Sequence, residues 1–270
     1  MSSQSAQKHI TLSTLNRIRA DGRKFACLTA YDACFAGLLN DGGVEVILVG
    51  DSLGMVLQGH DNTLPVTMAD MVYHVQCVKR GNSTAFLMAD MPFMSYSSET
   101  ETLENAAALM RAGAEMVKLE GGAWLASSTS LLAERGIPVC VHMGLTPQSI
   151  NRIGGYLVQG RDPVQAENMV REAIQLQEAG ASILLLECVP TALAKRITDS
   201  LEIPVIGIGA GPHTTGQVLV LHDLLGISPI RPKFVKNFLA ESDQGIAGAI
   251  KAYADAVKNG DFPAAEHSFD

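Results

Sequence analysis

The sequence has few cysteines, and none of them form a CxxC pair. The five are Cys27, Cys34, Cys77, Cys140 and Cys188. Three of them lie in or beside apolar segments, where a free thiol behaves as a small hydrophobic group. This spacing gives no sign of a disulfide framework or of a structural zinc site. We therefore expect free thiols and a reducing, cytoplasmic environment.

The chain also lacks a basic cluster and a long apolar segment. It carries 20 Lys and Arg residues against 28 Asp and Glu residues, a net charge of -8. Nucleic acid and membrane are not expected as partners, because nucleic acids and anionic membranes both bind basic surfaces. The N-terminal segment lacks the basic and apolar regions of a secretory signal, and nowhere do about 18 apolar residues run together. We expect a soluble protein.

Hydrophobic residues, in contrast, are abundant. The 270 residues are 47% hydrophobic and 18% charged, which indicates a globular protein with a sizeable core. A chain of this length can form a single large domain, as (β/α) barrels of ~250 residues do.

Apolar segments that are typical of buried parallel strands alternate with segments of helical periodicity. Helices are expected over 67–80, 99–112, 123–135, 163–179, 191–200 and 214–220. Strands are expected at FACLTA (25–30), VEVILVGD (44–51), TAFLMAD (84–90), MVKLE (116–120), PVCVHM (138–143), SILLLE (182–187), VIGIG (205–209) and near 219–226. Eight strands are the number that closes a barrel.

The last of these strands could equally be a helix, because VLVLHDLLG fits both patterns. A doubly wound open sheet is the alternative fold, and it would place a ligand at one reversal of strand order. Polar strand ends are instead spread over five consecutive strands. The pattern favours one (β/α)8 TIM barrel domain over residues 1–270. An N-terminal helix over about 11–21 and C-terminal helices over about 234–260 are expected to pack on it.

Five of the apolar segments end on a charged or ionisable residue. These residues are Asp51, Asp90, Glu120, His142 and Glu187. The carboxyl ends of parallel strands meet at one rim of a barrel, where such folds carry their chemistry. Four carboxylates with one lysine (Lys118) and one histidine would be costly to bury without a cation, so a hard divalent metal is the simplest explanation.

Each of these residues also has a structural explanation. Asp51 and Asp90 could cap the turns that follow their strands. Lys118 and Glu120 lie two apart on one strand and face the same side, so they could form a structural ion pair. His142 could be a satisfied core histidine. One shared metal site accounts for the three carboxylates at once, whereas capping requires three coincidences.

Glu187 follows four apolar residues, a setting that suits a general base near neutral pH. It could instead be a charge at the N-terminus of the following helix. Lys118 beside a metal would hold the carboxylate or carbonyl group of an anionic substrate. The residues alone predict a metal-assisted enzyme that removes a proton next to the carbonyl of a small anionic substrate.

Two longer segments interrupt the alternation, 52–66 and 144–162. Loops of this length after barrel strands often form lids and substrate contacts, so both are candidate walls of the site. They could equally be surface connections without a role in function.

Several strings closely resemble the ketopantoate hydroxymethyltransferase family. They are LTAYDA (28–33), LVGDSLGMV (48–56), ADMPF (89–93), VKLEGG (117–122), HMGLTPQSI (142–150), GGYLVQGR (154–161), LLECVP (185–190) and IGIGAG (206–211). The resemblance runs from about residue 10 to 260. It implies a (β/α)8 barrel of the phosphoenolpyruvate/isocitrate lyase-like type that forms a large homo-oligomer, a decamer.

The resemblance also implies a reaction in pantothenate and coenzyme A synthesis. A hydroxymethyl group passes from 5,10-methylenetetrahydrofolate to 3-methyl-2-oxobutanoate through a Mg-stabilised enolate, which gives 2-dehydropantoate. By resemblance, Asp51 and Asp90 bind Mg²⁺ and contact the substrate, and Glu120 contributes to the metal site directly or through water. Ser52 and Lys118 hold the anionic end of the substrate.

By the same resemblance, Glu187 accepts the proton from C3 of the substrate and His142 lines the pocket. Two positions depart from the family pattern. Thr215 stands where members carry an aspartate before Gly-Gln, and Val141 stands where a small Gly or Ala precedes the strand histidine. These departures bear on the fit of the folate or on subunit contacts.

Two rival functions remain on the sequence alone. A carbon–carbon lyase of the same barrel type would also chelate Mg²⁺ with a 2-oxo acid, but such lyases place a cysteine in a lid loop. Neither 52–66 nor 144–162 contains a cysteine. A non-catalytic binding or scaffold protein is the second rival, in which replacement of Glu187 would change no measurable property.

Overall fold

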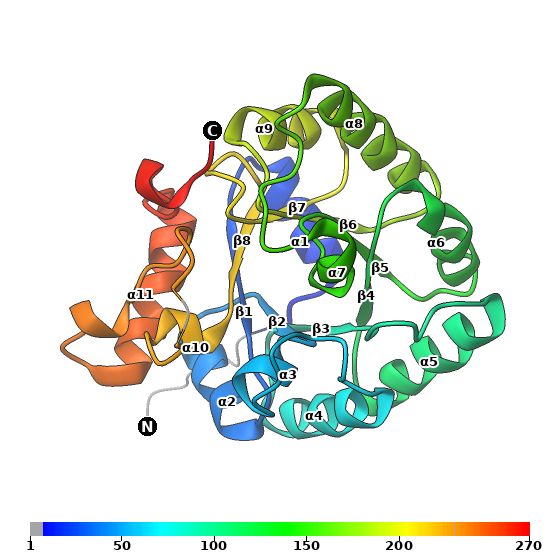
Figure 1. The fold of residues 1–270 in the computed structure, drawn as a ribbon. Coiled ribbons are helices and arrows are strands. Elements are labelled where there is room, and N and C mark those ends of the chain that lie inside the picture. Colours follow the sequence, from blue (N-terminus) through cyan, green and yellow to red (C-terminus); the bar gives the residue numbers. More distant parts are fainter. Residues whose placement is uncertain (1–7, 230) are drawn as a thin grey trace.

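The computed structural model describes residues 8–229 and 231–270, and its strands form a closed parallel barrel (Figure 1). The strands are β1 (Phe25–Thr29), β2 (Val46–Val49), β3 (Phe86–Asp90), β4 (Met116–Glu120), β5 (Val139–Gly144), β6 (Ile183–Glu187), β7 (Val205–Ile208) and β8 (Gly216–Leu219). Each strand pairs with the next, and β8 pairs with β1. The predicted barrel is confirmed, and the open sheet is wrong.

Burial explains the composition of the strands. Every residue within the four strands β1, β2, β3 and β4 is buried. One side of each strand faces the barrel interior, and the other side faces the surrounding helices. Val, Ile, Leu and Met therefore fill both faces. Charged residues enter these runs near the carboxyl ends of the strands, as at Asp90, Lys118 and Glu120.

Helices surround the barrel (Figure 1). They are α2 (Ala33–Asp41), α3 (Leu53–Val56), α4 (Met68–Gly81), α5 (Glu99–Ala112), α6 (Ala126–Ala133), α7 (Ile150–Ile153), α8 (Pro163–Glu178), α9 (Thr191–Ser200), α10 (Leu221–Leu224) and α11 (Gly245–Asn259). The side chains of Thr67, Ser98 and Asp162 cap α4, α5 and α8 by accepting a backbone N–H hydrogen bond from the first turn. None of the described helices is both long and apolar enough to cross a membrane.

Helix α1 (Leu12–Ala20) lies at the amino end of the barrel. The Ile10 N–H before it donates to the carbonyl of Thr84 at the entry to β3, and Arg19 donates to the carbonyl of Leu201 before β7. Leu15 and Ile18 are buried. Helix α1 therefore covers part of this end of the barrel.

Helix α11 packs against β1 and α2, which puts it beside the seam that closes the barrel. The fully buried Tyr253 hydroxyl lies 2.8 Å from the carbonyl oxygen of Cys27 on β1 and 2.9 Å from that of Gln217 on β8. Its O–H thus links the helix to the two strands that meet at the seam.

Replacing Tyr253 with phenylalanine is expected to lower the free energy of unfolding by about 1–3 kcal/mol, because the buried carbonyls lose their donor while the ring keeps its packing. Denaturant unfolding followed by circular dichroism measures the change. Tyr73→Phe is the matched control, since Tyr73 is 62% exposed, and it should leave the midpoint unchanged. Equal midpoints for Tyr253→Phe and the native chain would contradict this role of the hydroxyl.

The expected ending of the barrel is wrong in two respects. Residues 214–220 are not a helix, and the last strand is β8 (Gly216–Leu219), followed by α10, rather than a strand near 219–226. A Cβ on Gly216 would lie 2.6 Å from the Phe25 ring, so only glycine allows β8 to pair closely with β1 at this point. The apolar run therefore splits into the end of a strand and a short helix, which periodicity cannot distinguish.

The two long loops contain short helical turns. Helix α3 lies in 52–66, and a 3₁₀ turn, η2 (Pro147–Ser149), together with α7 lies in 144–162. The Tyr156 hydroxyl lies 3.5 Å from the Met55 sulfur, so the two loops contact each other. In Figure 1, α7 projects over the ring of strands. At the other end of the chain, residues 234–238, which were expected to be helical, are not.

Candidate active site

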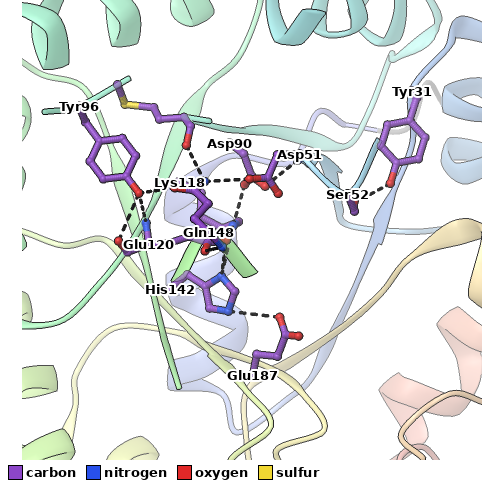
Figure 2. Close-up of polar contacts among 11 residues, drawn as sticks. Tyr31, Asp51, Ser52, Asp90, Tyr96, Lys118, Glu120, His142, Gln148 and Glu187 are labelled. Carbon is purple, nitrogen blue, oxygen red and sulfur yellow. Dashed lines mark hydrogen bonds and ion pairs between the residues drawn. The ribbon is translucent and has the colours of Figure 1, made fainter. Parts of the chain in front are cut away.

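The polar residues predicted at the strand ends lie together at the carboxyl rim (Figure 2). Five of them are 2–4% exposed as whole residues: Asp51, Asp90, Lys118, Glu120 and His142. The register of the barrel strands determines which of these residues lie next to each other. Asp90 on β3 is paired with Lys118 on β4, and Glu120 on β4 is paired with His142 on β5. Residues far apart in the chain therefore form one buried polar cluster.

Asp51 and Asp90 are in direct contact. The backbone N–H of Asp51 donates to Asp90 Oδ2 at 2.9 Å. Burial raises the pKa of Asp51 well above its usual range, and the nearby charges of Asp90 and Glu120 raise it further. The nearby positive charge is thus too small to offset the cost of ionising Asp51 next to Asp90.

Lys118 is the cation of the cluster. Its Nζ lies 2.9 Å from Asp90 Oδ1 and 3.4 Å from Glu120 Oε1. Burial disfavours the charged lysine, but the carboxylates of Asp90, Glu120 and Asp51 outweigh burial and raise its pKa well above the usual range. The ion pair with Glu120 is present, although the contact with Asp90 is the shorter one.

His142 connects Glu120 to Glu187. Its Nδ1 lies 3.2 Å from Glu120 Oε1, and its Nε2 lies 3.3 Å from Glu187 Oε2. Burial and Lys118 oppose its protonation, but the charge of Glu120, the hydrogen bond to Glu120 and the close contact with Glu187 raise the pKa of His142 to about 9. Although burial opposes ionisation of Glu120, the charges of Lys118 and His142 lower its pKa to about 2. This shift favours the imidazolium form of His142 between the two carboxylates, against the charge of Lys118, whose Nζ lies 3.3 Å from His142 Nδ1.

Glu187 is the most accessible carboxylate of the cluster, with a side chain 14% exposed against 2–4% for Asp90 and Glu120. The backbone around it is constrained. Cys188 has a positive φ of 49°, rare for a residue with a side chain, and a Cβ on Gly144 would lie 2.3 Å from the Glu187 carbonyl oxygen. Helix α9 begins only at Thr191, so Glu187 does not cap it. It borders the open side of the cluster.

Ser52 lies beside the two aspartates. A Cβ built on Gly50 would be 3.1 Å from Ser52 Oγ and 3.4 Å from Asp90 Oδ2. The Ser52 hydroxyl and the Asp90 carboxylate therefore both lie close to the backbone of Gly50. The Tyr31 hydroxyl lies 2.9 Å from Ser52 Oγ and orients it. Tyr31 was not predicted as a site residue, although it lies in the LTAYDA string.

Gln148 and Tyr96 were also missed. Gln148 Nε2 donates to Asp51 Oδ2 at 2.8 Å, and the Gln148 backbone N–H donates to Glu120 Oε2 at 3.0 Å. The Tyr96 hydroxyl donates to Gln148 Oε1 at 2.5 Å. Both residues lie in loops without periodicity. The only signal for Gln148 was its place in the HMGLTPQSI string of a suspected lid.

The donor set fits a hard divalent cation. Four acids (Asp51, Asp90, Glu120, Glu187) face two bases (Lys118, His142), so acidic side chains outnumber basic ones by two. The buried Asp90 Oδ1 has no well-aligned hydrogen bond, although it lies near the Lys118 ammonium. Among the described residues, no group of three or more His, Cys, Asp or Glu side chains is arranged to hold a metal ion by itself. A site with few protein ligands and room for substrate oxygens is what Mg²⁺ uses.

Solved structures of related fold define the class. The chain superposes on the crystal structure of a phosphonopyruvate hydrolase with a TM-score of 0.61 at 14% identity, covering 78% of this chain and 80% of that one. It superposes on 2,3-dimethylmalate lyase, a member of the PEP mutase/isocitrate lyase superfamily, with a TM-score of 0.57 at 15% identity over 77% and 80%. The chain therefore shares its barrel fold with these two proteins.

The family follows from the sequence comparisons. The model of the ketopantoate hydroxymethyltransferase family matches residues 9–265. A 3-methyl-2-oxobutanoate hydroxymethyltransferase of Marinobacter nauticus is 60% identical over 96% of this chain and 98% of its own length. One of Photorhabdus laumondii is 57% identical over 97% and 99%. The chain belongs to the ketopantoate hydroxymethyltransferase family, as its motifs predicted, and is a transferase.

Proposed function

We propose that the protein transfers a hydroxymethyl group from 5,10-methylenetetrahydrofolate to 3-methyl-2-oxobutanoate. The overall reaction consumes one water and yields 2-dehydropantoate and tetrahydrofolate, a step toward pantothenate and coenzyme A. The observation that carries the proposal is the buried cluster at the carboxyl rim, with Lys118 for an anionic group and Glu187 on its accessible side. It occurs in a chain about 60% identical to enzymes named for this reaction.

In this proposal Asp51 and Asp90 hold Mg²⁺, and Glu120 contributes directly or through water. When bound, the ion withdraws charge from the keto oxygen and so makes the C3–H bond of the substrate more acidic. Ser52 and Lys118 bind the substrate carboxylate. Their positions beside Asp90 support this, since a 2-oxo acid bound at the aspartates would have its anionic end within their reach.

Glu187 is the base that takes the C3 proton. His142, charged and 3.3 Å from Glu187 Oε2, orients the carboxylate and lines the pocket. The carbanion at C3 then forms a carbon–carbon bond to the methylene carbon of the folate. The two bonds from that carbon to the folate nitrogens are broken, the nitrogens take up protons, and water supplies the hydroxyl oxygen. The contact of Tyr156 with Met55 supports a role of loops 52–66 and 144–162 in sheltering that carbanion from protonation by bulk water.

The test is incubation of the protein with both substrates and Mg²⁺, with and without a chelator, followed by detection of 2-dehydropantoate. We expect product only when Mg²⁺ is available. Product formation that is insensitive to the chelator would contradict the proposed requirement for Mg²⁺. Cleavage of a carbon–carbon bond in a 2-oxo acid, without one-carbon transfer, would instead favour the lyase alternative.

The state of the protein in the cell is part of the proposal. We propose one barrel domain over residues 1–270, in the cytoplasm, where the five free thiols would stay reduced. We also propose self-association into a decamer, which rests on the family resemblance. Sedimentation velocity tests this, and a particle of 28.7 kDa, the mass of one chain, contradicts it.

A further inference from the structure

Gln148 joins the loop after β5 to three other strand ends. It lies in the 3₁₀ turn η2 and is 6% exposed, whereas Asn151 and Arg152 just beyond it are exposed. Its side-chain Nε2 donates to Asp51 after β2 and, at 3.0 Å, to the carbonyl of Met91 after β3. Its backbone N–H donates to Glu120 at the end of β4. One residue of the loop thus contacts two of the three acids in the proposed metal site (Figure 2).

These contacts occupy one oxygen of each acid. Gln148 holds Asp51 Oδ2 at 2.8 Å and Glu120 Oε2 at 3.0 Å. The backbone N–H of Asp51 holds Asp90 Oδ2 in the same way. The Asp51 carboxylate is therefore fixed in rotation by Oδ2, which leaves Oδ1 for a cation. The second oxygens of Asp90 and Glu120 contact Lys118 instead, and that of Glu120 also contacts His142. Partners that orient metal ligands in this way strengthen metal binding.

The orientation of the Gln148 amide is determined by its surroundings. The Tyr96 hydroxyl donates to Gln148 Oε1 at 2.5 Å, which identifies this amide atom as the oxygen. The amide nitrogen must then face the two acceptors, Asp51 and the Met91 carbonyl. Tyr96 is itself held by stacking with Trp124, whose ring centroid is 6.1 Å away at an interplanar angle of 13°. A side chain without an N–H donor cannot replace these bonds.

We propose that Gln148 is a positioning residue for the metal site: its amide sets the orientation of Asp51 and thereby the affinity for Mg²⁺. The inference rests on the proposed function, because it assumes that Asp51 binds the metal. Gln148 acts through Asp51, which its side chain contacts directly. A change at Gln148 should therefore alter metal binding more than the chemical step.

The experiment compares Gln148→Met with the native protein. Methionine has a similar length and volume and keeps the backbone N–H to Glu120, but it lacks the amide donors. Mg²⁺ binding is measured by isothermal titration calorimetry on the full chain in the presence of 3-methyl-2-oxobutanoate. We expect the affinity to fall about 10–100-fold. The half-saturating Mg²⁺ concentration for exchange of the C3 proton should rise in parallel, while the rate at saturating Mg²⁺ stays within about threefold.

The matched control is Gln159→Ala in the same loop. The Gln159 side chain bonds only to Leu157 and Gln165 among the described residues, so its loss should leave Mg²⁺ affinity unchanged. If Gln148→Met binds Mg²⁺ as the native protein does, or loses saturated rate without a change in Mg²⁺ dependence, the inference is wrong. Absence of Mg²⁺ binding by the native protein would instead overturn the proposed function.

Discussion

Replacing Glu187 with glutamine is expected to abolish exchange of the C3 proton of 3-methyl-2-oxobutanoate with solvent deuterium. The amide cannot accept the proton, and loss of a general base typically costs about 10²–10⁴-fold in rate. Binding of Mg²⁺ and of the 2-oxo acid should persist. His142 keeps its hydrogen bond to Glu120, and the substitution leaves the three proposed metal acids unchanged.

Proton NMR of the substrate in deuterated buffer measures the exchange directly, without the folate. Glu202→Gln is the control, because Glu202 is an exposed acid on the surface and should exchange the proton at the native rate. Exchange at the native rate in Glu187→Gln would mean that another group is the base. Loss of 2-oxo acid binding in that variant would mean that Glu187 has a binding role.

Replacing Asp51 or Asp90 is expected to remove the stimulation of turnover by Mg²⁺. Asp51→Asn and Asp90→Ala each delete a charged oxygen ligand that the site needs for a hard cation. The readout is the initial rate across a Mg²⁺ titration. Asp61→Ala is the control, since Asp61 is an exposed acid in the same loop as Ser52 and is not one of the proposed metal ligands. Metal-stimulated turnover in both site variants would contradict the assignment.

Asp51→Asn should also stabilise the metal-free protein. Burial, then Asp90 and Glu120, raise the pKa of Asp51 above its value in the unfolded chain. An acid with a raised folded pKa favours folding less as the pH rises, so its charge destabilises the fold at pH 7. Thermal melting with a chelator should therefore show a higher midpoint for Asp51→Asn than for the native chain. A lower midpoint would mean that the charge is compensated without metal.

The barrel could be predicted because its strands are short, apolar and separated by helices with clear periodicity. Helices α5 and α9 were expected at the bounds that the structure has. The prediction failed at β8, where Gly216 and the seam with β1 decide the local structure. The choice between strand and helix there depends on closing the barrel, a contact between residues almost 200 positions apart, which no local pattern contains.

The amino-acid sequence by itself determined which acids, lysine and histidine reach the rim, because a polar residue that ends a buried run lies at the carboxyl end of its strand. It also determined the family through its motifs. Only the tertiary structure decided the contacts among these side chains. The register sets Asp90 opposite Lys118, and the loop after β5 brings Gln148 to Asp51. Such contacts follow from the closure of the barrel and the path of its loops, so they join residues whose distance in the chain carries no information about their distance in space.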